Sequence, residues 1–422
     1  MKVLVLGAGY MAYVTARDLA LSPKVTEIVI ADPNQKNAEQ IASRIKSDKI
    51  SVRRVNITDR GNLVKALKGT DAVTNCIWYA YVMDVMKAAI ESKVPCVDLG
   101  GTYFDTLKKL EFNDLAKRTG VTYMLGCGLA PGITNIMARH GANKLDKVHE
   151  IHIIGGSPPL KDFEMKFLYS PHTYLAQFTK EAIIFQNGEY KTLPPRSGRE
   201  YLRLPPPFNQ DVEMYYTLHS ELATLPHTIE GVKDVDMRLI YSPELIKVFN
   251  LFVDCGLTSE EPIQVRGFSV APYEVLTLCL TKHMDRRGDR IWSTEVIGEK
   301  SGVKTRVQIY IISEYHEAWG VAGVGYATGV AASIACQMLA KGDVKMKGVV
   351  PPEVCIKPQS FFEELNKRGI PIYETVETIR KVGGEAPASK AVETSRKVGG
   401  EAPASKAVEK PRKIRKVRFL RI

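Results

Sequence analysis

The chain has 422 residues, enough for two domains that each bury a core, and its 45% hydrophobic and 25% charged residues are typical of a globular protein. Its seven cysteines are an odd number without a Cys-x-x-Cys pair, which excludes a disulfide framework and a structural zinc site and favours a reducing, cytoplasmic compartment. The formal charge is +11, but residues 380–422 hold 13 Lys and Arg against 4 Glu, so the rest is close to neutral. Contact with nucleic acid is therefore expected only of this tail.

The first 130 residues alternate apolar strands with helices, which is the pattern of a parallel sheet. The chain begins directly with a strand, so we expect no signal peptide. The expected strands are Lys2–Leu6, Glu27–Ala31, Ser51–Ile57, Ala72–Ile77, Cys96–Leu99 and Val121–Leu125. The helices expected between them are Met11–Ala20, Asn37–Ser47, Gly61–Lys68, Val82–Ser92 and Thr106–Thr119. This order predicts an α/β protein with an N-terminal Rossmann domain, a doubly wound parallel sheet, over residues 1–130.

Strands dominate the next part of the chain, residues 131–320. The clearest are Glu150–Gly155, Met237–Tyr241 and Thr305–Ser313, and they predict a mixed α/β substrate domain. A helix is then expected over Tyr326–Leu339. It lies in an uncharged span of about 23 residues, long enough to cross a bilayer, but its richness in Gly and Ala favours a buried helix, and no membrane contact is expected.

The last segment contains an internal repeat. Arg380–Glu393 reads RKVGGEAPASKAVE and recurs identically at Arg396–Glu409, before the basic run Lys410–Arg421. Such Gly-, Ala- and charge-rich copies cannot build a core. We predict that residues 380–422 form a disordered basic tail that is dispensable for folding and catalysis.

A dinucleotide-binding fingerprint, G-x-G-x-x-A, follows the first strand and opens the first helix. Its residues are Gly7, Ala8, Gly9, Tyr10, Met11 and Ala12. Gly7 permits the tight turn, Gly9 lets the backbone approach a pyrophosphate, and Ala12 allows close contact between helix and strand. The exposed N–H groups of the helix then face the phosphates.

The second strand ends at Asp32, about 20 residues beyond Ala12, where a carboxylate can accept hydrogen bonds from the adenosine ribose. Because the same carboxylate repels a 2′-phosphate, NAD is expected in preference to NADP, and the nearby Lys36 weakens that preference. The alternative is a glycine turn without a cofactor.

Further cofactor contacts are expected where other strands end, because ligands of such sheets bind outside the carboxyl ends of the strands. Asn56 and Ile57 are placed to flank the adenine, and Asn75 and Asp98 end the fourth and fifth strands. Cys127 lies in this rim too, but no adjacent His or Asp suggests a nucleophile. We find no metal-ligand pattern, P-loop or nucleophile elbow, so no metal is expected.

Several longer stretches carry a resemblance to a known family. They include NCIWYAYVMDVMKAAIESKVPCVDLGG, GLAPGITNIMARHGANKLD and KGVVPPE. The chain resembles the saccharopine dehydrogenase-like family, most closely its lysine 6-dehydrogenase branch. The resemblance implies a Rossmann domain, an inserted substrate domain over 131–320 and a return of residues 321–375 to the Rossmann domain. It also implies NAD(P)-dependent oxidation at a C–N bond of an amino acid, in a homodimer.

The chain departs from the family pattern at positions that bear on the substrate. Saccharopine-forming relatives carry Asp-Pro-Gly where this chain has Ala130-Pro131-Gly132. Lysine 6-dehydrogenases share the Ala but place an Asp where Gly126 stands, and the stretch Tyr241–Glu244 lacks the usual Arg, Gly and His character. We expect oxidation of a free diamino acid such as lysine at its terminal amine, and a saccharopine-forming or carboxynorspermidine-like enzyme is the alternative. A non-catalytic NAD-binding protein is the alternative of another class.

Oxidation of an amine needs a proton acceptor and a cation for the substrate carboxylate. Tyr79 matches an active-site tyrosine of the saccharopine-forming enzymes, and His219 matches a histidine of the lysine branch, so these two are the catalytic candidates. His172 is a third, and each could instead have a packing or structural role. Arg238 and Arg266 are candidates for binding the carboxylate.

Overall fold

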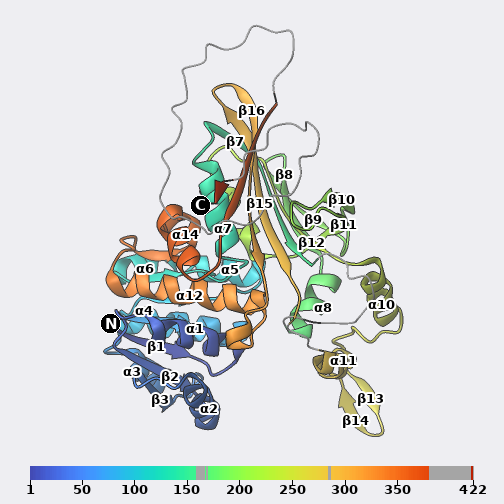
Figure 1. Cartoon of the computed structure of the whole chain (residues 1–422). Coiled ribbons are helices and arrows are strands. Elements are labelled where there is room, and N and C mark those ends of the chain that lie inside the picture. Colours follow the sequence, from blue (N-terminus) through green and yellow to red (C-terminus); the bar gives the residue numbers. More distant parts are fainter. Residues whose placement is uncertain (158–166, 168–169, 284–286, 380–419, 422) are drawn as a thin grey trace.

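A computed structural model of the chain describes residues 1–157, 167, 170–283, 287–379 and 420–421. Two sheets organise these residues (Figure 1): a parallel sheet with helices on both faces, and a larger mixed sheet that rises from it. The predicted fold class is confirmed.

The parallel sheet has seven strands in the order β17-β6-β5-β4-β1-β2-β3. Its strands are β1 (Lys2–Leu6), β2 (Glu27–Asp32), β3 (Ile50–Arg54), β4 (Ala72–Asn75), β5 (Cys96–Asp98), β6 (Thr122–Met124) and β17 (Gly348–Val350). Its helices are α1 (Tyr10–Leu21), α2 (Gln35–Ile45), α3 (Arg60–Leu67), α4 (Val82–Ser92), α5 (Tyr103–Leu110) and α6 (Asn113–Thr119). The strand order reverses between β1 and β4, which places the ligand crevice of a doubly wound sheet there.

Two features of this domain differ from the sequence prediction. The single helix expected over Thr106–Thr119 is two helices, because the chain turns at Glu111 and Phe112. The apolar periodicity does not reveal this turn, since both helices bury one side. The seventh strand, β17, joins the sheet beside β6 from far along the chain. This strand lies outside the alternating strand and helix pattern of the first 130 residues, so that pattern does not predict it.

The mixed sheet follows the path β10-β11-β12-β7-β15-β16-β18-β19, with β8 beside β12 and β9 beside β8. Its strands are β7 (Lys147–Gly156), β8 (Ala182–Gln186), β9 (Glu189–Leu193), β10 (Glu200–Arg203), β11 (Asp211–Tyr216), β12 (Asp234–Ile240), β15 (Arg290–Lys300), β16 (Val303–Ser313), β18 (Tyr373–Ile379) and β19 (Leu420–Arg421). β12 and β7 pair in parallel, and the remaining pairs are antiparallel.

The connections of this sheet supply the remaining elements. They are α7 (Ile133–Ala142), α8 (Pro171–Thr179), η2 (Ser220–Ala223), α9 (Leu225–Thr228), α10 (Pro243–Asp254), the hairpin β13 (Ile263–Val265) and β14 (Phe268–Val270), α11 (Pro272–Leu280), η3 (Thr281–His283) and η4 (Glu317–Trp319). The short helix η1 (Tyr79–Tyr81) follows β4 and belongs to the Rossmann domain. α8 and α11 lie on the same side of the molecule (Figure 1).

The C-terminal part returns to the Rossmann domain through α12 (Gly323–Lys341), α13 (Pro352–Cys355) and α14 (Pro358–Lys367). α12 lies against α1, because Gly329 leaves room for Val14: a Cβ at Gly329 would lie 2.6 Å from the Val14 Cβ. α12 is long and apolar enough to cross a membrane, but 83% of its apolar window is buried inside the fold. It is therefore a packing helix of the domain.

The predicted tail lies outside the described residues except at Leu420 and Arg421. These two residues, which composition assigns to a disordered tail, form β19 opposite Tyr373 and Glu374 of β18. Pairing with the edge of a sheet satisfies backbone groups whatever the side-chain composition, so composition does not reveal it.

Candidate active site

The fingerprint forms the turn that its glycines require. Gly7 has φ +96°, and a Cβ there would lie 3.1 Å from the Cys76 carbonyl oxygen of the neighbouring strand end. Gly9 is the N-cap of α1, and a Cβ there would meet nothing within 4 Å. The backbone N–H groups at the start of α1 thus border open space of the kind a pyrophosphate needs. The Tyr10 hydroxyl accepts a hydrogen bond from Ala322 N at 2.7 Å. The contacts that Tyr10 and Met11 were predicted to make with the cofactor stay predictions.

Asp32 holds the fingerprint turn in place. Its Oδ2 accepts a hydrogen bond from Ala8 N at 2.8 Å, and its Oδ1 accepts one from Asn34 N at 2.8 Å. The carboxylate thus lies beside the turn, where the ribose of a dinucleotide is bound in this fold. Beyond β3, the exposed Asn56 accepts hydrogen bonds from Thr58, and Ile57 packs against the core. The contact that Asn56 and Ile57 were predicted to make with the adenine stays a prediction.

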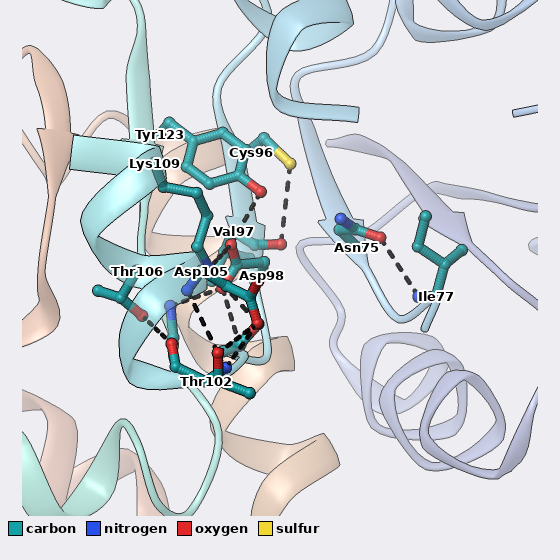
Figure 2. Close-up of polar contacts among 12 residues, drawn as sticks. Asn75, Ile77, Cys96, Val97, Asp98, Thr102, Asp105, Thr106, Lys109 and Tyr123 are labelled. Atoms are coloured by element: carbon teal, nitrogen blue, oxygen red, sulfur yellow. Dashed lines mark hydrogen bonds and ion pairs between the residues drawn. The ribbon is translucent and has the colours of Figure 1, made fainter. Parts of the chain in front are cut away.

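The end of β4 meets the second domain in a group of aromatic rings. Asn75 is buried, and its Oδ1 accepts a hydrogen bond from Ile77 N at 3.2 Å (Figure 2). Trp78 is 55% exposed, and its ring centre lies 5.5 Å from that of Tyr79 and 6.0 Å from that of His172 on α8. We call Trp78, Tyr79, His172 and Tyr273 the aromatic lip, because the Tyr273 ring of α11 stands 4.8 Å from His172.

Tyr79 is the member of the aromatic lip that sequence reasoning assigned to catalysis. Burial raises its pKa, and the negative charge of Asp105 raises it further. Tyr79 therefore keeps its proton at neutral pH, so it can donate a hydrogen bond to substrate but is a poor base in this state.

Asp98 is the centre of a buried cluster below the rim, which Figure 2 shows. Its Oδ1 accepts hydrogen bonds from Gly100 N at 2.8 Å and Gly126 N at 2.7 Å. Its Oδ2 accepts from Lys109 Nζ at 2.8 Å and from the Tyr123 hydroxyl at 2.9 Å. Burial, followed by the charge of Asp98, raises the pKa of Tyr123 well above its usual value, so the hydroxyl keeps the proton that it donates.

This cluster ties the loops after β5 and β6 to one carboxylate. Asp98 is completely buried and has four donors from the chain itself. Its predicted direct contact with the cofactor stays a prediction, and the geometry favours a positioning role, because both oxygens are already engaged. Sequence reasoning missed Lys109, although its spacing from Tyr103 and Thr106 places it on the buried side of α5.

His219 precedes η2 and contacts the buried Glu221 through its Nδ1. The other oxygen of Glu221 accepts a hydrogen bond from the Thr134 hydroxyl at 2.8 Å. Burial would raise the pKa of Glu221, but the adjacent His219 and the Thr134 hydrogen bond bring it below its usual value. The Glu221 carboxylate can orient the imidazole through Nδ1, which leaves Nε2 for contact with a substrate. Sequence reasoning missed Glu221.

His219 and Tyr79 come from different domains, since Tyr79 follows β4 and His219 precedes η2. The residue after His219, Ser220, lines a small cavity together with Gly126 and Pro131 of the rim. No hydrogen bond joins the Tyr79 and His219 side chains among the residues that the structure describes. Tyr79 is therefore grouped with His172 on one side of the rim, while His219 lies near the loop that Asp98 anchors.

A second buried carboxylate, Glu353 of α13, joins the C-terminal return to α7. Its oxygens accept hydrogen bonds from Asn135 Nδ2 at 3.1 Å and from the Thr228 hydroxyl at 3.2 Å. Burial raises the pKa of Glu353. Sequence reasoning missed this residue. This network holds the start of α7, directly after the Ala130-Pro131-Gly132 loop.

The two candidate arginines do not lie free at the rim. Arg238 is bonded to Glu200 at 2.8 Å and to the Tyr216 hydroxyl at 2.8 Å. Arg266 is at the turn of the β13–β14 hairpin. Arg238 is thus engaged by partners from its own domain. Cys127 is completely buried, and burial raises its pKa well above the usual value, which fits the interpretation as an unreactive residue.

A doubly wound sheet, a glycine turn opening a helix and an acidic end to β2 together define a dinucleotide-binding protein of the oxidoreductase type. The chain matches the saccharopine dehydrogenase NADP binding domain over residues 3–124 and the saccharopine dehydrogenase C-terminal domain over residues 128–370. It therefore belongs to the saccharopine dehydrogenase family of NAD(P)-dependent oxidoreductases, as its resemblance implied.

Similar proteins span nearly the same length. A carboxyaminopropylagmatine dehydrogenase of Synechocystis is 23% identical over 89% of this chain and 98% of its own. A carboxynorspermidine synthase of Vibrio cholerae is 27% identical over 88% of this chain and 96% of its own. The solved saccharopine dehydrogenase (L-Glu forming) of Saccharomyces cerevisiae shares the fold, with a TM-score of 0.71, 18% identity and coverage of 90% of this chain and 100% of its own.

Proposed function

We propose that the chain transfers hydride between a nicotinamide and the carbon of a C–N bond in a carboxylated amine of the carboxynorspermidine type. The observation that carries the proposal is the match to carboxynorspermidine synthase over 96% of that enzyme. The aromatic lip supports it, because Trp78 and Tyr79 stand where the crevice faces the second domain, and aromatic faces attract the cationic groups of an amine.

The proposed chemistry is reversible. In the oxidative direction the C–H bond beside the nitrogen breaks, its hydride reduces the nicotinamide, and the amine loses a proton to become an imine. Water then adds to the imine and releases a carbonyl compound and an amine. A bound nicotinamide supplies only the hydride acceptor or donor.

The chain's own residues supply the binding and the proton transfer. The Gly7–Gly9 turn and Asp32 would hold the dinucleotide, and we propose NAD as the preferred form because Asp32 would repel a 2′-phosphate. His219, oriented by Glu221, takes the proton from the amine. Tyr79 donates a hydrogen bond that positions the reacting group. We also propose that the protein is a homodimer. A reducing cytoplasm is the proposed compartment, because all seven cysteines are free.

Oxidation of free lysine at its terminal amine is a second candidate. The observation that favours it is Ala130, which leaves the rim one carboxyl group short of the saccharopine-forming pattern. A saccharopine site must also hold three carboxylates and so needs several cations, whereas a lysine site needs only one such clamp.

The test is formation of NADH or NADPH with carboxynorspermidine, saccharopine and lysine compared side by side. We expect the highest kcat/KM with carboxynorspermidine and NAD. A wide preference for lysine would replace the first proposal by the second. Absence of turnover with every amine and both cofactors would refute both.

A further inference from the structure

The hairpin of β13 and β14 has an apolar face that is largely exposed. The two strands form a sheet of their own, which projects beyond α11 and away from both large sheets (Figure 1). Since successive residues of a strand alternate between its faces, the pairing register places four apolar side chains on one face. They are Ile263, Val265, Phe268 and Val270. Ile263 is 54% exposed, Val265 45% and Phe268 73%.

The outer side of α11 continues the apolar surface along the chain. This helix begins two residues after β14, and its buried side includes Tyr273 and Leu276. On its outer side Val275 is 47% exposed and Leu278 71%. We call Ile263, Val265, Phe268, Val275 and Leu278 the hairpin patch. The aromatic lip uses the inner side of α11, so a partner that covers the outer side does not contact Tyr273.

The size of the hairpin patch matches one half of a stable protein interface. The exposed fractions of its five side chains amount to about three whole apolar side chains, or roughly 450–600 Å². Because a little over half of a typical interface is apolar, this area corresponds to an interface of about 800 Å² per partner, the standard size. An isolated two-stranded hairpin is marginally stable in water, so a covering surface also stabilises the hairpin itself.

Two charges at opposite ends of the hairpin favour a second copy of the chain as the partner. Arg266 is in the turn, and Glu261 lies two residues before β13, at the base. Both are exposed, and neither forms an ion pair within 4 Å among the residues that the structure describes. When two hairpins lie antiparallel about a two-fold axis, the turn of each meets the base of the other, so Arg266 meets Glu261 of the partner subunit. An arrangement with the turns together would place two Arg266 side chains side by side, which like charges oppose.

We propose that the hairpin patch is the interface of a two-fold dimer, in which the hairpins of two copies lie antiparallel and bury their apolar faces against each other. This inference rests on the proposed function only in locating the contact of the homodimer proposed there, and it assumes nothing about the substrate. An anionic lipid surface is a poorer partner, because the carboxylates of Glu260, Glu261 and Glu274 flank the hairpin in the chain.

The experiment measures the mass of the full chain in solution by sedimentation velocity over a range of micromolar concentrations. We expect a dimer for the wild type. Phe268→Lys and Leu278→Lys should each raise the dissociation constant of the dimer by at least about 100-fold, because each charge enters the apolar contact twice. The matched control is Leu21→Lys, since Leu21 is 69% exposed at the end of α1, outside the patch, and this variant should remain a dimer.

An exchange of charges tests the antiparallel arrangement. Arg266→Glu should raise the dissociation constant of the dimer by about 10-fold, because it places two carboxylates together at each end of the contact. Arg266→Glu/Glu261→Arg should restore the wild-type value, since the pair forms again with its signs reversed. Circular dichroism and NADH binding show whether each variant folds.

A monomeric wild type would overturn the assignment, as would a dimer that survives both Phe268→Lys and Leu278→Lys or a double variant as weak as Arg266→Glu. Binding of the wild type to vesicles of phosphatidylcholine and phosphatidylserine, lost in Phe268→Lys, would overturn it in favour of a lipid surface. Turnover of carboxynorspermidine by a monomeric wild type would refute this inference alone. A dimer of the expected behaviour without turnover of any amine would refute the proposed function alone.

Discussion

Lys109→Met tests whether the buried cluster at Asp98 organises the rim. The ammonium and carboxylate groups are 1% and 0% exposed and 2.8 Å apart. Methionine keeps most of the apolar stem but leaves the Asp98 carboxylate without a cation. Breaking a buried pair in this way costs about 3–5 kcal/mol, because the remaining charge cannot return to water. The free energy of unfolding of a folded protein is about 5–15 kcal/mol, so this loss is a large fraction of it.

Urea unfolding measures this loss as a lower midpoint at an unchanged slope. Lys108→Met is the matched control, since its side chain is exposed on the same helix, and it should change stability by less than about 0.5 kcal/mol. The double variant Asp98→Asn/Lys109→Met should recover part of the loss, because it removes both charges. If Lys109→Met costs no more than Lys108→Met, the cluster does not stabilise the fold as argued.

Three further predictions concern the cofactor, the proton acceptor and pH. Asp32→Ala should bring the dissociation constants for NADP and NAD closer together. It should also weaken NAD binding, because Asp32 holds the Ala8 amide. A wild type that binds NADP more tightly than NAD would contradict the reasoning. His219→Gln should lower kcat by about 10²- to 10⁴-fold and leave NADH affinity unchanged; unimpaired turnover would exclude His219 as the proton acceptor. Burial lowers the pKa of His152, but the hydrogen bonds that its ring nitrogens donate to Asp236 and Glu150 outweigh this effect and raise the pKa to about 10. Its stabilising contribution should therefore be complete below about pH 6.5, the unfolded value, and disappear as the pH rises towards 10. In His152→Gln that part of the pH dependence of unfolding should be missing, and an unchanged profile would refute the assignment.

Local sequence patterns were sufficient for six of the seven strands of the Rossmann domain. Most of these strands are buried and read as apolar runs, and the helices between them have one apolar side, so burial leaves a pattern in the sequence. The Gly7–Gly9 turn and Asp32 were also predictable, because the backbone geometry of the turn and the end of β2 depend on neighbours in sequence.

Partners that are distant in sequence could not be predicted. In the sequence, Lys109 cannot be distinguished from other lysines, and only the placement of α5 brings it to Asp98. Likewise, Glu221 accepts a hydrogen bond from Thr134 only because η2 packs near α7. Neither long-range pairing has a local periodicity, because a hydrogen bond or an ion pair does not depend on the spacing of residues along the chain.

The placement of the arginines shows the same division. Composition presents Arg196, Arg238 and Arg266 as equivalent cations, and sequence reasoning selected the latter two. Only the tertiary structure places Arg238 against Glu200, Arg266 at a hairpin turn and Arg196 over the Phe178 ring. The sequence by itself determined where a dinucleotide can bind, since that site is built by one short segment. The tertiary structure decided which charges pair with one another, since that depends on every element packed around them.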